Sequence, residues 1–327
     1  MSKYKIGIIG CGFIGNKRAK ALEGNELVYV ADTNEDLAKK LAAEYNCKHS
    51  TNYMDLIKSD VDIVIISTSN NMLIPIALEA VKHHKHVLIE KPGARNPTEM
   101  KQLLDAVHGT DIKVKVGFNH RYHPAIMKAK EIIKSNNYGE IMFIRAKYGH
   151  GGRIGYDKEW RAKKSVSGGG ELLDQGCHLI DLGTMFLGEF SDAIGYTQKY
   201  FWDMEVEDNG FALLRTSKGQ IMQMHASWTD WKNIFNFEIM CKTAKLEISG
   251  LGKSYGTETL TIFRMKPEMG PPDKEVLTFE GEDNSWNLEF KDFIDAIAHN
   301  RKLPDLDNAY SVLKTIYNIY EWNDMNK

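Results

Sequence analysis

The stretch GCGFIG, which follows an apolar run at residues 4–9, is the feature that most constrains the fold. Its glycines Gly10, Gly12 and Gly15 have the spacing G-x-G-x-x-G, and a helix-like segment and a second apolar run ending at Asp32 come next. A glycine turn between a strand and a helix lets the backbone approach a pyrophosphate, and the amino terminus of the helix attracts its negative charge. The stretch therefore predicts a dinucleotide-binding β–α–β unit.

The acid at the end of the second apolar run bears on the choice of dinucleotide. A carboxylate at the position of Asp32 accepts hydrogen bonds from the ribose hydroxyls and repels a 2′-phosphate, so it favours NAD over NADP. We therefore expect NAD as the cofactor. The residues predicted to bind it in this segment are Gly10, Gly12, Phe13, Ile14, Gly15 and Asp32.

Strand-like and helix-like segments alternate up to about residue 120, which is typical of a doubly wound parallel sheet. The apolar run at 61–68 suits a strand that is buried on both faces. Ligands of such sheets bind at the carboxyl ends of the strands. Polar residues stand at these strand ends, and we expect the following to border the cofactor: Thr68, Asn70, Glu90, Lys91 and Asn119.

The pattern changes after residue 120. Between 194 and 280 several strand-like runs follow one another without long helices, which indicates a largely antiparallel sheet. The predicted fold class is α/β: an N-terminal Rossmann domain with a doubly wound parallel sheet, followed by an α+β domain with a large open, mostly antiparallel sheet. We place the NAD-binding domain at 1–120 and the substrate-binding and oligomerisation domain at 121–327, with the final helices packing back toward the first domain.

An open sheet has two faces, and helices can cover one of them. The other face would expose apolar groups, and a second copy of the sheet would cover it, so we expect a homodimer or homotetramer.

The stretch ELLDQGCHLIDL at 171–182 reads as one helix with an acid and a histidine among its apolar residues. Asp174 and His178 are four residues apart and would share one helical face. Such a pair indicates either a polar pair satisfied in the core or a face that lines a cleft.

Composition excludes several classes of protein. The formal charge is −2 and no basic block is present, so no nucleic-acid partner is expected. No apolar run reaches the length of a membrane span. The four cysteines are scattered without a CxxC pair, which favours reduced thiols in the cytoplasm over disulfides, and the histidines and cysteines predict no metal site.

Three separated motifs, GCGFIG, EKP at 90–92 and GGGELLDQGCHLIDL at 168–182, resemble the glucose–fructose oxidoreductase/inositol dehydrogenase (Gfo/Idh/MocA) family. The resemblance extends over essentially the whole chain. It implies an enzyme that transfers a hydride between NAD and a hydroxyl-bearing carbon of a sugar, inositol or nucleotide-linked sugar. It also implies that Lys91, Asp174 and His178 are the catalytic residues.

The division of labour between His178 and Lys91 stays open, because a neutral imidazole and a lysine of depressed pKa can each accept the alcohol proton. Two rival functions also stay open: an epimerase or eliminase that uses tightly bound NAD without net redox change, and a non-catalytic NAD-binding regulator. The loop after the strand at 141–150 is expected to face the substrate. Its residues predicted to bind cofactor are Trp160 and Arg161, and the predicted substrate-binding set is Lys91, Arg121, His150, Arg153, Tyr156, Asp174 and His178.

Overall fold

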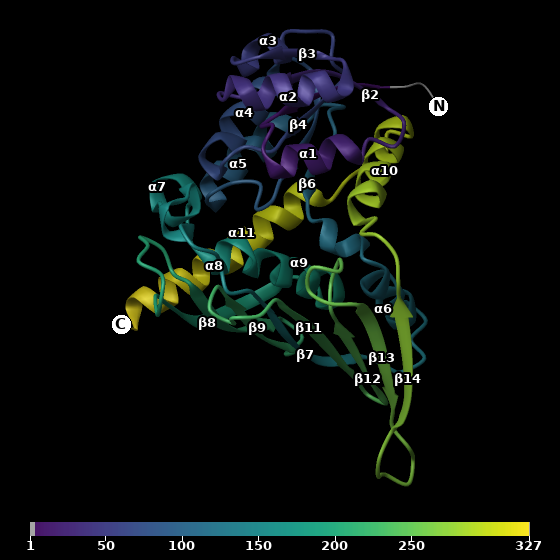
Figure 1. The fold of residues 1–327 in the computed structure, drawn as a ribbon. Coiled ribbons are helices and arrows are strands. Elements are labelled where there is room, and N and C mark those ends of the chain that lie inside the picture. The colour runs from purple at the N-terminus through teal and green to yellow at the C-terminus, as the bar shows by residue number, and fades with distance from the viewer. Residues whose placement is uncertain (1–3, 327) are drawn as a thin grey trace. The chain divides into compact units, whose positions relative to one another are not determined.

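The computed structural model describes residues 4–326, and this part of the chain divides into two compact units (Figure 1). Unit 1 contains the residues up to 118 together with 165–168 and 286–310, and unit 2 contains 119–164, 169–285 and the residues from 311 onward. The segment 286–310 is thus assigned to unit 1, whereas the chain from 311 onward is assigned to unit 2.

Unit 1 is built on a six-stranded parallel sheet with the order β3-β2-β1-β4-β5-β6. The strand order reverses beside β1, and dinucleotides bind at such a switch point. All four residues of β4 are buried, as expected for a strand covered on both faces. The strands are β1 (Lys5–Ile9), β2 (Glu26–Ala31), β3 (Lys48–Ser50), β4 (Ile63–Ile66), β5 (His86–Glu90) and β6 (Val114–Gly117).

The helices of unit 1 begin where polar side chains cap them. The side chain of Asn34 accepts hydrogen bonds from the backbone at the start of α2, and Asn96 does the same for α5. The helices connecting the strands are α1 (Phe13–Lys20), α2 (Glu35–Tyr45), α3 (Tyr53–Ile57), α4 (Asn70–Lys82) and α5 (Pro97–Val107).

A late helix, α10 (Ser285–Ala298), completes the core of unit 1. Its Phe290 and Phe293 are buried in one apolar cluster with Ile6 and Ile8 of β1. The last helix, α11 (Asp305–Met325), and the short α7 (Lys164–Ser167) contribute residues to both units.

Unit 2 is built on an eight-stranded sheet with the order β14-β13-β12-β11-β7-β10-β9-β8. Only the pair β7 and β10 is parallel among the strand pairs of this sheet in the described chain. The fold class predicted from the sequence is thus confirmed. The strands are β7 (Ile141–Gly149), β8 (Phe190–Gln198), β9 (Asn209–Thr216), β10 (Ile221–Ser227), β11 (Ile234–Cys241), β12 (Ala244–Ser249), β13 (Glu258–Arg264) and β14 (Asp273–Phe279).

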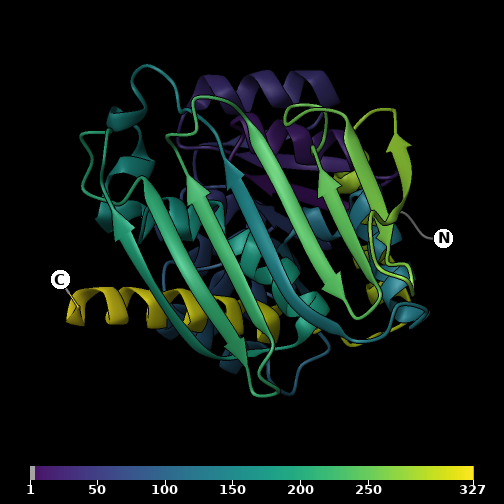
Figure 2. The same ribbon diagram turned by 90° about the horizontal axis from the view of Figure 1, so that it is seen from below.

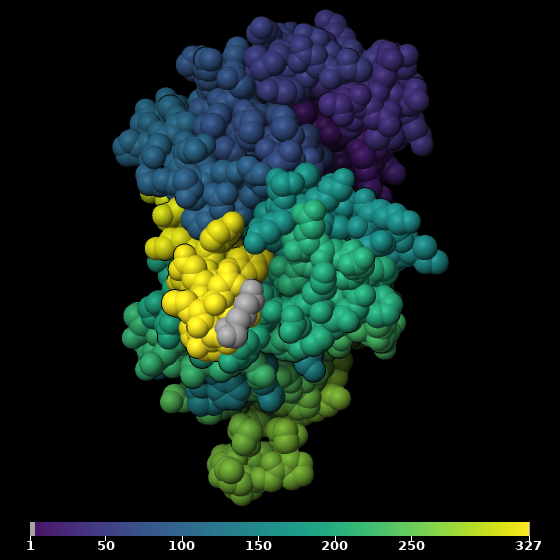
Figure 3. Space-filling view, turned by 90° about the vertical axis from the view of Figure 1, so that its left-hand side faces the viewer, coloured from purple at the N-terminus to yellow at the C-terminus, as the bar shows by residue number. Residues whose placement is uncertain are grey.

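Helices pack on one face of this sheet, and Figure 2 looks onto the other. The residues of β9 alternate between buried and exposed, as a strand with one covered face requires. The turn between β13 and β14 projects from unit 2 as the yellow-green lobe of Figure 3. The helical segments of unit 2 are the 3₁₀ turns η1 (Asn119–Tyr122), η2 (Tyr156–Lys158) and η3 (Trp160–Ala162), and the helices α6 (Pro124–Lys134), α8 (Glu171–Asp174) and α9 (Gly176–Leu187).

Two expectations from composition can be compared with these units. Between residues 4 and 326, no helix combines the length and apolar character that a membrane crossing needs. All four cysteines are free thiols in the structure.

Candidate active site

The glycine stretch forms the turn between β1 and α1. Gly10 has a φ of +95°, and a Cβ atom on it would lie 2.5 Å from the carbonyl oxygen of Ser67. A Cβ atom on Gly15 would lie 1.9 Å from the carbonyl oxygen of Gly10, so both positions require glycine. A Cβ atom on Gly12 would meet no described atom within 4 Å, which leaves this side of the turn open to a ligand.

The first turn of α1 follows directly. Gly12 is the N-cap residue and has no side chain to cap the helix, so the first backbone N–H groups of α1 are available to an anion. Phe13 and Ile14, both predicted to contact the cofactor, form the first turn, and the side chain of Phe13 is 75% exposed.

Asp32 is fixed at the carboxyl end of β2. Its carboxylate accepts hydrogen bonds from the backbone N–H groups of Cys11 at 2.7 Å and Asn34 at 2.8 Å. Burial, with a further contribution from Asp32, raises the pKa of the Cys11 thiol to about 12, so this thiol stays neutral beside the acid. An open glycine turn, an uncapped helix start and a carboxylate at the end of β2 together fit the pyrophosphate and ribose of a dinucleotide.

The residues after β4 make hydrogen bonds to the backbone of neighbouring loops. The hydroxyl of Ser67 donates to the carbonyl oxygen of Gly10 at 2.8 Å. Asn70, predicted to border the cofactor, is buried at the start of α4, and its amide donates to the carbonyl oxygen of Ser167 at 2.8 Å. Thr68 lies between them, and its hydroxyl donates to the carbonyl oxygen of Ser69 at 3.3 Å.

Glu90 ends β5 immediately before Lys91, and it belongs to a buried network that the sequence did not reveal. Arg18 of α1 donates from Nε to Glu90 at 2.6 Å and from Nη1 to Glu289 of α10 at 2.6 Å. The guanidinium also stacks on the ring of Trp286 at 4.4 Å. Arg18 stands in a run of lysines that reads as a solvated helix face, so no local signal marks it as buried.

The stretch predicted as one helix over 171–182 is interrupted at Gln175, so that expectation is wrong in its continuity. The N–H of His178 donates to the carbonyl oxygen of Gln175 at 3.0 Å, a tight 3₁₀-type bond at the start of α9. A Cβ atom on Gly176 would approach Met224 of β10 at 3.2 Å. The glycine lets the chain pass close to the sheet directly after the interruption.

Asp174, at the end of α8, is paired with Arg161 of η3 at 3.3 Å. Burial lowers the pKa of Arg161, but attraction by Asp174 and nearby groups outweighs it and the pKa is raised. The guanidinium lies 4.4 Å from the ring centre of Trp160, the other residue of this loop predicted to bind cofactor. Arg153 is exposed and pairs with Glu159.

His178 is buried, with 3% of its surface exposed, and it stacks on His120 of η1. The two ring centres are 3.7 Å apart and the ring planes differ by 15°. Tyr148 of β7 packs against both rings, at 5.2 Å from His120 and 6.2 Å from His178. Burial, followed by the influence of Tyr255, raises the pKa of Tyr148 well above its ordinary value, so the phenol is neutral.

Other predicted site residues have partners inside unit 2. Arg121 makes a double hydrogen bond with the fully buried Asp181, at 2.7 and 2.5 Å. His150 accepts a hydrogen bond from the N–H of Gly152 at 2.9 Å. Tyr156 is 3% exposed in a core cluster with Trp228 and others. Asn119 is also buried, and its amide joins His120 to Ser285.

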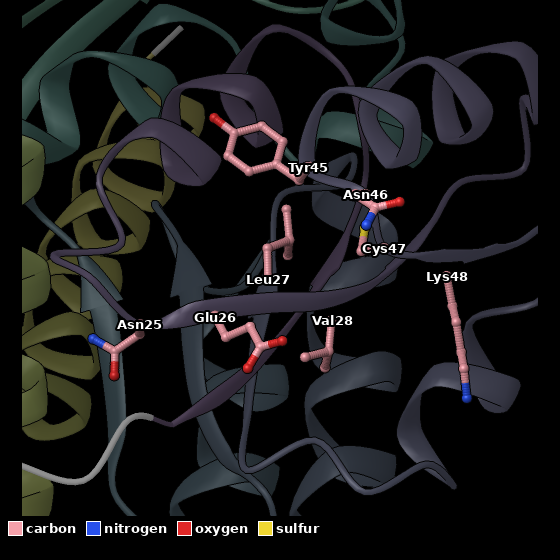
Figure 4. Close-up of a pocket in the computed structure, with 8 residues that line it drawn as sticks. All are labelled: Asn25, Glu26, Leu27, Val28, Tyr45, Asn46, Cys47 and Lys48. Carbon is pink, nitrogen blue, oxygen red and sulfur yellow. The ribbon is translucent and has the colours of Figure 1, made fainter.

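A surface pocket at the amino end of β2 is separate from these residues (Figure 4). It is lined by 25–28, at the start of β2, and by 45–48, which run from the end of α2 to the start of β3. Asp32 stands at the opposite end of the same strand, so this pocket is not the dinucleotide site.

Two family models match the chain. Residues 4–118 match the model described as oxidoreductase family, NAD-binding Rossmann fold, and residues 126–247 match the GFO/IDH/MocA C-terminal domain. The chain belongs to the GFO/IDH/MocA oxidoreductase family. The family predicted from the sequence is confirmed, and residues 4–118 of unit 1 match its NAD-binding Rossmann domain.

The curated relatives of this family member include dehydrogenases that are named for sugars. Levoglucosan dehydrogenase of Pseudarthrobacter phenanthrenivorans is 30% identical over 67% of this chain and 60% of its own length. Glucose-6-phosphate 3-dehydrogenase of Bacillus subtilis is 33% identical over 54% of this chain and 52% of its own length. The chain thus spans less than two thirds of either relative. Among solved structures, levoglucosan dehydrogenase in complex with NADH is 23% identical, with a TM-score of 0.90 over 100% of this chain and 98% of that one, which shows the same fold.

Proposed function

We propose that this chain is an NAD-dependent dehydrogenase that oxidises a hydroxyl-bearing carbon of a sugar, cyclitol or nucleotide-linked sugar, or catalyses the reverse reduction. The observation that carries the proposal is the buried imidazole of His178 in a member of a family whose first domain binds NAD. Oxidation of an alcohol releases a hydride and a proton, and NAD, when bound, accepts the hydride. A proton acceptor must then come from the protein.

In this proposal His178 accepts the hydroxyl proton, because a neutral imidazole is a suitable base near neutral pH. Lys91, beside the end of β5, donates a hydrogen bond to the reacting oxygen and stabilises its developing charge. The carboxylate of Asp174 accepts a hydrogen bond from a neighbouring hydroxyl of the substrate. Its charge is balanced by Arg161, so the site can hold a neutral polyol without an unpaired carboxylate.

The relatives support the substrate class. Levoglucosan and glucose-6-phosphate, named for two of them, and inositol, named for a 28% identical dehydrogenase of Rhizobium meliloti, are rings that carry several hydroxyl groups. Asp32 supports NAD over NADP, because both of its oxygens are held by backbone N–H groups and its charge would face a 2′-phosphate.

A panel of free sugars, sugar phosphates, inositols and nucleotide sugars, each with NAD, tests the proposal through the near-ultraviolet absorbance of NADH. We expect reduction of NAD with at least one polyol. Tightly retained NAD and no net reduction with any substrate, together with interconversion of a sugar, would instead support the epimerase or eliminase alternative.

We also propose that the chain forms a homo-oligomer through the open face of the unit 2 sheet (Figure 2). Phe143, Phe211, Leu213 and Ile221 of β7, β9 and β10 are 38–47% exposed. The register places Ile221 of β10 opposite Phe143 of β7, so two of these side chains lie directly side by side. A second copy of the sheet would remove this apolar surface from water.

A further inference from the structure

The stacked histidine pair His120 and His178 is connected to a carboxylate through buried polar groups. Nδ1 of His120 lies 3.2 Å from Oδ1 of Asn119, and Nδ2 of Asn119 donates to the hydroxyl oxygen of Ser285 at 2.8 Å. That hydroxyl lies 2.6 Å from Oδ1 of Asp283. His120, Asn119 and Ser285 are each no more than 6% exposed, so water does not compete for these bonds.

The carboxylate sets the direction of every hydrogen bond in this chain of groups. A carboxylate only accepts, so the hydroxyl of Ser285 must donate its proton to Asp283. The oxygen of Ser285 is then an acceptor, and the Nδ2 amide group of Asn119 turns toward it. Oδ1 of Asn119 therefore faces His120, and Nδ1 of His120 must carry a proton to bond with it.

We propose that His120 is a positioning residue for His178: Asp283, Ser285 and Asn119 hold its ring neutral and protonated at Nδ1, and that neutral ring stabilises the proton that His178 accepts. The inference rests on the proposed function, in which His178 is the base. A neutral ring face attracts a stacked cation, whereas a second imidazolium 3.7 Å away would repel it. The amide of Asn119 satisfies Nδ1 of His120 without adding a negative charge that would favour protonation of this ring.

Other charged and titratable groups surround the pair. His123 lies with its ring centre 5.5 Å from that of His120, and it is held by Glu258 of β13 at 3.1 Å. The side chain of Tyr148 of β7 is hydrogen-bonded to that of Tyr255. The carboxylates of α8, Glu171 and Asp174, further raise the pKa of both phenols. Asp174 is itself paired with Arg161. Arg121 and Asp181 of α9 form a further closed pair.

Nitrogen NMR of ¹⁵N-histidine-labelled protein tests the direction of the hydrogen bonds without substrate or cofactor. The His120→Phe spectrum assigns the His120 signals, and we expect Nδ1 protonated and Nε2 unprotonated at neutral pH. Asp283→Asn keeps an acceptor for Ser285 and should preserve this tautomer. Asp283→Ala removes the acceptor and should allow the other tautomer. An Nε2-protonated His120 in the unmodified protein would overturn the inference.

Asn119→Asp tests the effect on His178. A carboxylate beside Nδ1 should raise the pKa of His120 by about 1–3 units, and the resulting imidazolium should lower the pKa of His178 by about one unit. The acidic limb of kcat/KM for alcohol oxidation should then move to lower pH by the same amount. A merely structural disturbance would lower the maximal kcat/KM and leave the pH of the acidic limb unchanged. The dissociation constant for NADH, measured on each variant, separates these effects from loss of cofactor.

The two readouts distinguish the possible failures. If Asn119→Asp leaves the NMR titration of His178 unchanged, the coupling of the two rings is refuted. If the titration of His178 shifts and the acidic limb of kcat/KM does not, the coupling is supported and the proposed role of His178 as the base is refuted.

Discussion

Glu289 of α10 is a buried acid whose ionisation should make the stability of unit 1 depend on pH. It is fully buried, and the single guanidinium of Arg18 pairs with both Glu289 and Glu90. Burial raises the pKa of Glu289 from its ordinary 4.5 to about 7, despite the attraction of Arg18 and Lys115. In the unfolded chain the carboxyl returns to its ordinary value.

The sign of the effect follows from which state holds the proton. Between pH 4.5 and about 7 the folded protein binds a proton at Glu289 that the unfolded chain has released. Stability therefore falls as the pH rises through this window. A shift of roughly 2.5 pKa units corresponds to about 3 kcal/mol of unfolding free energy, an upper bound because unfolded chains keep some structure.

Glu289→Gln replaces the ionising group by a neutral one of the same shape that can still accept from Arg18. We expect the variant to match the unmodified protein at about pH 4, below the ordinary pKa of the carboxyl, and to exceed it by up to about 3 kcal/mol at pH 8. Urea unfolding at a series of pH values, followed by circular dichroism and by tryptophan fluorescence, to which Trp286 beside Arg18 contributes, measures this. Glu44→Gln, the same charge change at an exposed site on α2, is the control. A difference between Glu289→Gln and the unmodified protein that is constant from pH 5 to pH 8 would refute the reasoning.

Three further predictions concern the proposed function. Asp32→Ala should narrow the preference for NAD over NADP, as measured by the dissociation constants for both cofactors. Equal affinity of the unmodified protein for NAD and NADP would contradict the role of Asp32. His178→Ala should lower kcat by about 10²–10⁴-fold with little change in NADH affinity. The double variant that also carries Lys91→Ala should lose much less kcat than the product of the losses in the two single variants. An active variant with a lowered melting temperature would show that His178 is only structural. Light scattering should give two or four times the chain mass of 37.2 kDa, and a Phe211→Glu, Leu213→Glu variant should shift this toward one chain.

The glycine turn between β1 and α1 could be predicted from the sequence because its backbone requirements are local. Gly10 needs a positive φ and Gly15 needs room for a backbone contact, and both constraints act within a few residues. Asp32 follows at a spacing set by one helix and one strand. The alternation of strand-like and helix-like segments predicted the parallel sheet, and the run of consecutive strand-like segments predicted the antiparallel sheet after it.

The continuity of the helix over 171–182 could not be judged in the same way. Its apolar residues have helical spacing, yet Gly176 packs closely against Met224, a residue of a strand that is distant in sequence. The helical pattern is a local property, whereas the interruption at Gln175 goes with contact to the sheet. Prediction of Asp174 and His178 as site residues came from the spacing and the family resemblance, and their roles stay a proposal.

The sequence alone determined the glycine turn after β1 and the types of secondary structure, because backbone geometry and side-chain periodicity act over short distances. Tertiary structure decided which polar groups became partners. Arg18 bonds to an acid 271 residues away, and Asn119 bonds to Ser285 across 166 residues. No spacing rule predicts such pairs. They form because burial leaves each group without water, so only the polar atoms that the fold brings within reach can satisfy it.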